Sequence, residues 1–302
     1  METFYSHGKL LLTGEYLVLH GAVALALPTK LGQSLTVYNY LDDFMEWVAY
    51  KPDGKWFSAK IVPDTLEAVE TDNPAMASRL SEILKAVREL NPDILRHGLY
   101  FETRLEFDPE WGLGSSSTLI NNLAQWAGVN PYKLLRLTFG GSGYDIACAR
   151  AEGPILYKLI DHKPGTAKAA FNPPFADRLF FVYQGQKQTS SVEVKNFNAQ
   201  FNPDGHQDDT ETVSQISLTL PHIDRYSDFE SLMLLHEVCI ARCTGKTMVQ
   251  EDYPDFPGEL KSLGAWGGDF LMAVTEMPFE EVRDYFQAKG MNTIFQYQDL
   301  IL

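Results

Sequence analysis

The chain has 302 residues, of which 45% are hydrophobic and 22% are charged, and these proportions are typical of a globular protein that folds in water. This length favours two packed domains over one small domain. The formal net charge of −15 argues against a general nucleic-acid binder and against docking on anionic membranes, because both surfaces attract lysine and arginine.

The first third of the chain is predicted to be mostly β structure. Strands are expected where apolar residues run together or alternate with polar ones, at residues 9–12, 16–19, 34–40, 44–50, 56–62 and 99–107. Asp53-Gly54 lies between two of these strands and is the strongest hairpin signal in the chain. A helix is expected where apolar residues recur at helical spacing from Met76 to Leu90, and Pro92 ends it.

From residue 112 onward, helices and strands are mixed. Helices are predicted at residues 118–127, 131–139, 227–243 and 279–287, and strands at 155–160, 179–183, 271–275 and 293–297. Ser227 and Glu230 have the spacing of a capping box. Residues 202–212 are polar without a period and are predicted to form a surface loop. Because strands and helices do not alternate regularly, the predicted class is α+β.

The segment with the strongest functional signal is WGLGSSS at residues 111–117, between a predicted strand and a predicted helix. Glycines let the backbone curl so that several N–H groups point inward, and the following helix adds its positive end, which together bind anions such as phosphate. The serine hydroxyls can donate to phosphate or ligate Mg²⁺. A plain turn in which Ser117 caps the helix explains the same residues equally well.

Three further segments combine glycine with a charged residue. GGSGYDIA at 140–147 presents Asp145, which can be a helix cap or a carboxylate aimed at a substrate hydroxyl. GAWGGD at 264–269 requires a close approach of its backbone to a strand or a ligand. Lys9 in GKLLLTGE (residues 8–15) precedes a buried strand, where a lysine head needs an anion or solvent. Taken singly, each segment favours the structural explanation.

Taken together, the order of these four segments resembles that of the GHMP small-molecule kinases, with all three superfamily motifs present across nearly the whole chain. GEY at 14–16, GGD at 267–269 and YQGQKQTSSV at 183–192 look most like phosphomevalonate kinase, with mevalonate kinase next. The resemblance implies a two-domain α+β GHMP kinase fold. Its N-terminal nucleotide-binding domain, similar to ribosomal protein S5 domain 2, would span residues 1–165, and a ferredoxin-like C-terminal domain would span 166–302.

The resemblance also implies an ATP- and Mg²⁺-dependent kinase and a role for each matching residue. Asp145 would be the general base or would orient the acceptor oxygen, and Lys9 would offset the charge that develops during transfer. Ser116 or Ser117 would help to hold Mg²⁺. The ATP phosphates would be surrounded by Gly112, Leu113, Gly114, Ser115, Ser116 and Ser117. The acceptor would be contacted by Glu15, Lys187, Thr189, Ser190, Ser191, Lys195, Gly264, Ala265, Gly267, Gly268 and Asp269.

Three functions follow from this resemblance. The first is transfer of the γ-phosphate of ATP to an isoprenoid-pathway acid, phosphomevalonate or mevalonate. The second is a diphosphomevalonate decarboxylase, which the sequence GLGSSS disfavours because those enzymes resemble ASSA in motif two. The third is a non-catalytic relative that binds a metabolite or protein. It stays open because Trp266 replaces a usual glycine and residues 130–142 contain no acid that could serve as the metal-binding glutamate of mevalonate kinases.

Two possible metal sites are weighed against simpler explanations. His236, Cys239 and Cys243 share one face of the predicted helix 227–243, but one helix rarely supplies three ligands, so core packing is favoured. His206 lies near Asp204, Asp208 and Asp209, yet that segment lacks the glycine and terminal glutamate of a calcium loop. A solvated loop is favoured there.

The remaining features concern location and partners. Three cysteines, an odd and sparse set that includes Cys148, indicate a reducing compartment. The start of the chain has no basic region before an apolar stretch, and no apolar run approaches the roughly 20 residues of a membrane span. We therefore expect a cytoplasmic monomer or homodimer with a small-molecule acid or alcohol acceptor, and no nucleic-acid or membrane partner.

Overall fold

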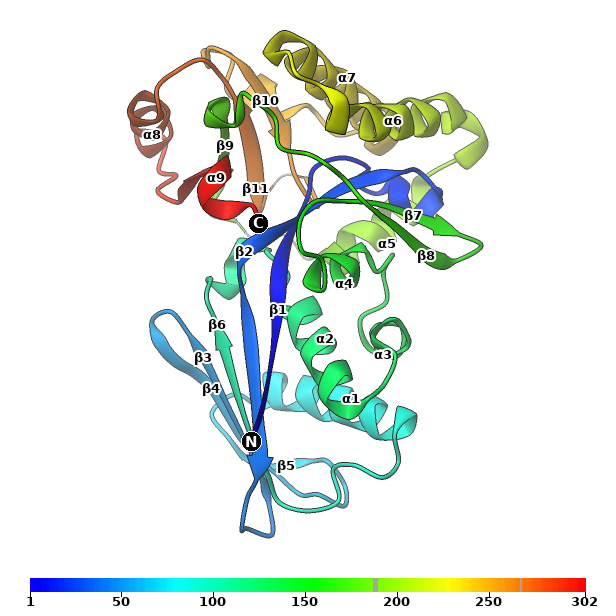
Figure 1. The fold of residues 1–302 in the computed structure, drawn as a ribbon, viewed down its shortest axis with the longest axis vertical. Coiled ribbons are helices and arrows are strands. Elements are labelled where there is room, and N and C mark those ends of the chain that lie inside the picture. The colour runs from blue at the N-terminus through cyan, green and yellow to red at the C-terminus, as the bar shows by residue number, and fades with distance from the viewer. Residues whose placement is uncertain (187–189, 267) are drawn as a thin grey trace. The chain divides into compact units, whose positions relative to one another are not determined.

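The computed structural model describes residues 1–186, 190–266 and 268–302 (Figure 1). The chain divides into two compact units. Unit 1 consists of Met1–Gly8, Leu31–Pro109 and Leu113–Arg150, and unit 2 of Lys9–Lys30, Glu110–Gly112 and Ala151–Leu302. The chain passes between the units several times because the long strands β1 (Glu2–Leu11) and β2 (Ala24–Asn39) contribute to both. The domain boundary near residue 165 stays a prediction.

Unit 1 contains the first part of a larger sheet, in the order β5-β4-β3-β6-β2, and β1 also pairs with β2. Its strands are β3 (Met45–Lys51), β4 (Gly54–Ile61), β5 (Ala68–Thr71), β6 (Leu99–Leu105) and the second half of β2. The β3–β4 hairpin closes with Lys51 opposite Gly54, which confirms the Asp53-Gly54 turn. The β3–β6 pair is parallel, whereas the other pairs are antiparallel.

Helices cover one face of this sheet and bury its core (Figure 1). They are α1 (Pro74–Leu90), α2 (Ser115–Ala127), α3 (Pro131–Thr138) and α4 (Tyr144–Ala149). Alternate residues of β6 face these helices, and its Phe101 stacks on Trp47 with ring centroids 5.0 Å apart. Asn73 caps α1 by accepting the N–H of Met76 through its side chain. The period-2 and period-3.6 patterns of the sequence therefore produce the expected two layers.

Unit 2 contains a second sheet in the order β10-β11-β9-β12, all antiparallel. Its strands are β9 (Leu179–Tyr183), β10 (Glu259–Ser262), β11 (Phe270–Val274) and β12 (Ile294–Gln296). Every residue of β11 is buried, so both of its faces are covered. In the same unit, the first half of β2 pairs with β7 (Ile155–Ile160), which forms a hairpin with β8 (Lys163–Lys168).

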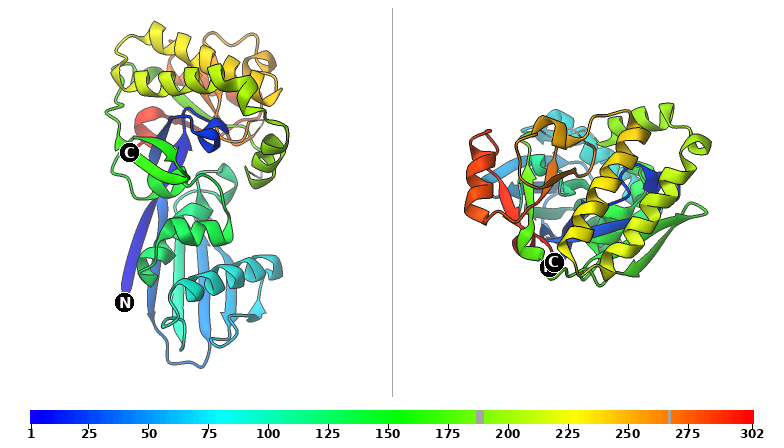
Figure 2. Two further views of the ribbon diagram at one scale, coloured as in Figure 1. Left: turned by 90° about the vertical axis from the view of Figure 1, so that its right-hand side faces the viewer. Right: turned by 90° about the horizontal axis from the view of Figure 1, so that it is seen from above.

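The helices of unit 2 include a long pair, α6 (Gln207–Thr219) and α7 (Tyr226–Thr244), which lie side by side (Figure 2). Helix α7 also contacts β10. The remaining helices are α5 (Ser190–Gln200), α8 (Phe279–Gln287) and α9 (Tyr297–Leu300). Val282 and Phe286 of α8 pack against the sheet in one apolar cluster. No helix among the described residues is long and apolar enough to cross a membrane.

The α+β class is confirmed, but three local predictions are wrong. Residues 202–212 are not a loop, since a 3-10 turn (Pro203–His206) leads directly into α6. The predicted strand at 16–19 is a 3-10 helix, Leu17–His20, because Gly14 and Tyr16 have left-handed φ values of 89° and 59°. Ser227 does not cap α7, because the helix already begins at Tyr226, whose hydroxyl donates to Glu230.

Candidate functional site

The start of α2 in unit 1 has free backbone donors. Gly114 is the N-cap residue with a left-handed φ of 94°, and no side chain caps the helix. The first bond of the helix runs from the N–H of Thr118 to the carbonyl of Gly114, at 3.0 Å. The N–H groups of Ser115, Ser116 and Ser117 precede it and therefore have no acceptor within the helix. Together with the positive end of the helix, they form a site where an anion is stabilised.

The three serine hydroxyls of this segment differ in their surroundings. Ser117 is 2% exposed, and its hydroxyl donates to the carbonyl of Gly114 at 2.9 Å. The buried Ser117 hydroxyl therefore stabilises the turn at Gly114. Ser116 is exposed and Ser115 is partly exposed. The hydroxyls of Ser115 and Ser116 are therefore the better placed pair to meet a phosphate or a metal ion from solvent.

Asp145 lies in the first turn of α4, also in unit 1. The N-cap position is Gly143, with a φ of 86°, so Asp145 is not the helix cap that its sequence context suggested. Its side chain accepts the N–H of Ile146 at 3.0 Å and is partly buried. A carboxylate in the first turn is stabilised by the helix dipole. The glycine turn before α4 therefore presents one carboxylate at a defined place.

Lys9 in unit 2 lies on β1 and donates from Nζ to the carbonyl of Gly112 at 2.7 Å. Gly112 itself has a φ of 69°, and a Cβ placed there would lie 2.6 Å from Cγ of Asp269. A Cβ at Gly264 would lie 3.5 Å from the same carboxylate. Lys9, Gly112 and Asp269 belong to three glycine-containing segments that are far apart in the sequence. Their contacts place these three segments next to one another. Glycine is required at 112 because both the left-handed backbone and the Asp269 side chain exclude a larger residue.

Side chains bind the carbonyl groups of Ala265, Trp266 and Gly268. The hydroxyl of Tyr16 donates to the Ala265 carbonyl at 2.8 Å, and Lys246 Nζ lies 3.3 Å from the Trp266 carbonyl. Trp266, with a φ of 47°, is 2% exposed and belongs to an apolar cluster with Tyr16. The indole of Trp266 therefore packs in the core of unit 2. The carbonyl of Gly268 accepts from Gln184 at 2.9 Å.

A buried ionic network lies beneath this segment. Lys261 on β10 is fully buried and donates to Glu15 Oε1 at 2.5 Å and to the Ser262 carbonyl at 2.8 Å. Glu237 of α7 is 1% exposed and accepts the N–H of Ser262 at 3.1 Å. His236 is also fully buried, with Nε2 at 3.2 Å from Glu15 Oε2. Buried charges require such partners, since an isolated one is very costly.

The protonation of this network follows from its hydrogen bonds. His236 Nε2 accepts the N–H of Gly14 at 3.0 Å, so that nitrogen carries no proton to donate to Glu15. Burial and the neighbouring charge of Lys261 hold the pKa of His236 well below its ordinary value of 6.5. Burial, partly offset by Lys261, raises the pKa of Glu15 to about 7. His236 is therefore neutral, and Glu15 exchanges its proton near neutral pH.

The structure describes only some of the other residues that were predicted to contact the acceptor. Lys187, Thr189 and Gly267 lie outside the described residues. Ser190 and Ser191 begin α5, and Lys195 is exposed on it. The sequence did not reveal the residues that hold the glycine segments. These residues are Tyr16, His236, Glu237, Lys246 and Lys261. They are distant in sequence from their partners, and the only signal that could have found some of them is a charged or histidine side chain on an otherwise apolar element.

The fold resembles solved small-molecule kinases over nearly its whole length. Mevalonate kinase of Methanococcus jannaschii matches with a TM-score of 0.72 and 16% identity, covering 97% of this chain and 96% of that one. Streptococcus pneumoniae phosphomevalonate kinase, in complex with phosphomevalonate and AMPPNP, matches with a TM-score of 0.72 and 17% identity, covering 98% and 100%. Lactococcus lactis galactokinase, complexed with galactose, matches with a TM-score of 0.65 and 11% identity, covering 97% and 92%.

No family model matches the sequence, and no curated protein sequence matches it. At 11%, 16% and 17% identity, these structural likenesses are likenesses of fold. The two-domain α+β GHMP kinase fold expected from the motifs is therefore confirmed, and the resemblance to that superfamily is one of fold.

The buried pair predicts a strong and coupled effect on stability. Lys261→Met should lower the free energy of unfolding by about 3–5 kcal/mol, because Glu15 would be left buried without its cation. The Lys261→Met, Glu15→Gln double variant should lose clearly less than the sum of the single losses. Lys168→Met is the matched control, since Lys168 and Glu152 are 88% and 84% exposed, and such a pair contributes at most about 1 kcal/mol. Urea denaturation of these three variants and of the Glu15→Gln single variant measures the losses. Additive losses in the double variant would contradict the pairing.

The two titrating groups predict opposite dependences on pH. Below pH 6.5, His236 is protonated in the unfolded chain but not in the native state. This residue therefore lowers the free energy of unfolding as pH falls. Glu15 acts in the other direction between pH 7 and its ordinary value of 4.5, because the native state binds its proton first.

His236→Gln removes one of these opposing contributions. Between pH 7 and pH 5, the stability of this variant relative to wild type should rise by up to about 2 kcal/mol as pH falls. The stability of Glu15→Gln relative to wild type should instead fall as the pH is lowered from 7 to 5. Denaturant unfolding at several pH values measures both, and a difference that does not change with pH would refute the assigned protonation states.

Proposed function

We propose that the chain is an ATP- and Mg²⁺-dependent kinase that transfers the γ-phosphate to an isoprenoid-pathway acid, with phosphomevalonate as the first candidate acceptor and mevalonate as the second. The observation that carries this proposal is the uncapped start of α2, where Gly114 leaves three serine N–H groups at the positive end of a helix. The solved phosphomevalonate kinase with AMPPNP and phosphomevalonate has the same fold and supports it.

The proposed nucleotide site is built mainly from backbone. The amides of residues 112–117 would surround the ATP phosphates, and their hydroxyls and amides suit an anion. Mg²⁺ prefers oxygen ligands and keeps several waters, so a single hydroxyl together with the phosphates would be sufficient. The exposed hydroxyl of Ser116 fits that role better than the buried hydroxyl of Ser117, which supports the turn. Bound Mg²⁺ would supply charge neutralisation between the phosphates.

Asp145 and Lys9 are the proposed catalytic residues. Asp145 would accept the proton of the acceptor or orient its oxygen, and the first turn of α4 holds its carboxylate in place through the N–H of Ile146. Lys9 would offset negative charge during transfer, and its bond to the Gly112 carbonyl holds the start of the phosphate loop. Phosphoryl transfer depends mostly on such positioning and charge, and requires little covalent chemistry from the protein.

The acceptor would be contacted by residues from unit 2, including Lys195 and the backbone of the 264–269 segment, whereas the predicted contact by the Glu15 side chain is not retained. Glu15 is wholly buried and bonded to Lys261. Its contribution is therefore to fix the Thr13–Glu15 backbone, with the acceptor met by the glycine segments that this backbone supports. We also propose that residues 1–165 form the nucleotide-binding domain and 166–302 the ferredoxin-like domain.

A coupled assay for ADP release tests the proposed activity. The purified chain is incubated with MgATP and, separately, mevalonate, phosphomevalonate, diphosphomevalonate, homoserine and galactose. Turnover with phosphomevalonate or mevalonate is the expected result. Phosphate and CO₂ release from diphosphomevalonate would establish the decarboxylase instead. Turnover with none of them, and no AMPPNP binding, would establish the non-catalytic relative.

Replacing the proposed base separates catalysis from binding. Asp145→Asn should lower kcat at least about 100-fold, because the amide cannot take a proton, while AMPPNP affinity stays within about threefold. Asp93→Asn, an exposed carboxylate elsewhere in unit 1, should leave kcat unchanged. Steady-state kinetics and calorimetric titration measure the two quantities. Full activity in Asp145→Asn would remove this residue from the mechanism.

Removing the lysine beside the phosphate loop should also reduce turnover. Lys9→Ala is expected to lower kcat by about 100-fold to 1,000-fold, since it deletes a charge that acts in the transition state. Lys133→Ala, an exposed lysine on α3, is the matched control and should behave as wild type. If Lys9→Ala raises only KM, the residue contributes to binding and not to the transfer step.

A further inference from the structure

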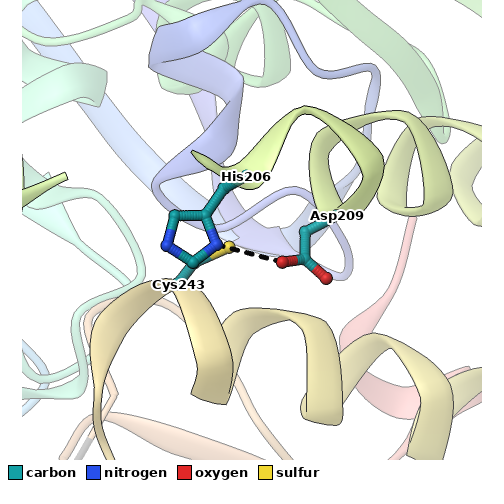
Figure 3. A group of neighbouring side chains, drawn as sticks. All are labelled: His206, Asp209 and Cys243. Atoms are coloured by element: carbon teal, nitrogen blue, oxygen red, sulfur yellow. Dashed lines mark hydrogen bonds and ion pairs between the residues drawn. The ribbon is translucent and has the colours of Figure 1, made fainter. Parts of the chain in front are cut away.

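Three metal-ligating side chains meet at one end of the α6–α7 pair in unit 2 (Figure 3). His206 ends the 3-10 turn before α6, Asp209 lies in the first turn of α6, and Cys243 lies in the last turn of α7. One ligand atom from each residue lies within 4.8 Å of the other two. His206 Nδ1 and Asp209 Oδ2 are 3.1 Å apart. The sequence showed these residues in two unrelated segments, and the fold combines them.

The donor set of this cluster is one nitrogen, one carboxylate oxygen and one sulfur. Tetrahedral Zn²⁺ binds these three donor types at about 2.0–2.3 Å, so its ligand atoms lie well under 4.8 Å apart and a small closure of the cluster would suffice. Mg²⁺ and Ca²⁺ prefer oxygen ligands only. The cluster is therefore distinct in chemistry from the proposed Mg²⁺ position, and the inference does not depend on kinase activity.

Neighbouring residues already orient the carboxylate. Arg242 Nη2 lies 2.5 Å from Asp209 Oδ1, which leaves Oδ2 directed to His206. The same Arg242 nitrogen lies 3.5 Å from Cys239 Sγ, and the ring of Phe201 stacks on His206 with centroids 5.5 Å apart. Contacts of this kind around the ligands fix their orientation and tune metal affinity.

The cluster is shielded on one side and open on the other. The side chains of His206 and Asp209 are 27% and 11% exposed, and Cys243 is 8% exposed. This leaves access for an ion and for a water as a fourth ligand. Cys243 also lies at the negative end of the α7 dipole, which favours a cation. Burial raises the pKa of Cys243 to about 12, so an incoming metal must displace the thiol proton.

We propose that His206, Asp209 and Cys243 bind one zinc-like transition-metal ion that joins the start of α6 to the end of α7. The ion would be held by three protein ligands and one water. Binding would release the Cys243 thiol proton. The Nδ1 proton of the existing His206–Asp209 contact would pass to His206 Nε2, so that Nδ1 and Oδ2 each bind the ion.

Cobalt titration of the full chain tests this proposal, because Co²⁺ reports a tetrahedral thiolate site through its visible d–d bands and its ultraviolet sulfur-to-metal band. Wild type should bind one equivalent with both signals, and Zn²⁺ should displace it. Cys243→Ala should lose the sulfur band, and His206→Gln should weaken binding at least about tenfold. Cys148→Ala and Cys239→Ala are the thiol controls and should keep both signals.

Circular dichroism of each variant confirms that the helices remain folded. The proposal is overturned if wild type binds no stoichiometric Co²⁺. It is also overturned if the sulfur band survives in Cys243→Ala or disappears in Cys239→Ala, since the thiolate ligand would then be absent or a different residue. Zinc affinity measured by competition with a chromophoric chelator gives an independent readout and should fall in Asp209→Asn.

Discussion

The ion pair between Lys261 and Glu15 is the constraint on which the interior of unit 2 depends. Both side chains are fully removed from solvent, and their removal from water costs several kcal/mol for each charge. Their close contact and the bond to the Ser262 carbonyl offset that cost. The pair connects the Thr13–Glu15 turn to β10, and β10 leads directly into the 264–269 segment. Two of the glycine motifs are thus held by one charged contact.

Backbone groups, not basic side chains, supply most of the donors of the proposed anion site. Glycines at 112 and 114 adopt left-handed conformations, and the helix that follows leaves its first N–H groups without acceptors. In the proposed function, an acidic chain would bind a nucleotide in this way, because amides and a few lysines would replace a basic surface. Most of the acidic excess lies in residues 201–302, whereas Lys9 and the proposed phosphate-binding residues 112–117 belong to the first 200 residues.

Local patterns predicted most elements of the fold, but long-range contacts remained hidden. The strand 155–160 and the helix 279–287 have the predicted bounds because their hydrophobic periods are clear. Helix α6 was missed because its first turn is polar, although Val213 and Ile216 continue a buried face. Glycine patterns also drew attention to the segment 111–117 and to Asp145, and the roles proposed for them stay predictions. The Lys261–Glu15 pair could not be found, because its partners are 246 residues apart and no spacing rule joins them.

The central claim is that the backbone at the start of α2 binds the phosphates of ATP. Amide NMR of the ¹⁵N-labelled chain during titration with Mg²⁺ and AMPPNP tests it most directly. The account predicts saturable shifts that are largest for Ser115, Ser116 and Ser117. Binding that leaves those three amides unshifted, or no binding at all, would contradict it.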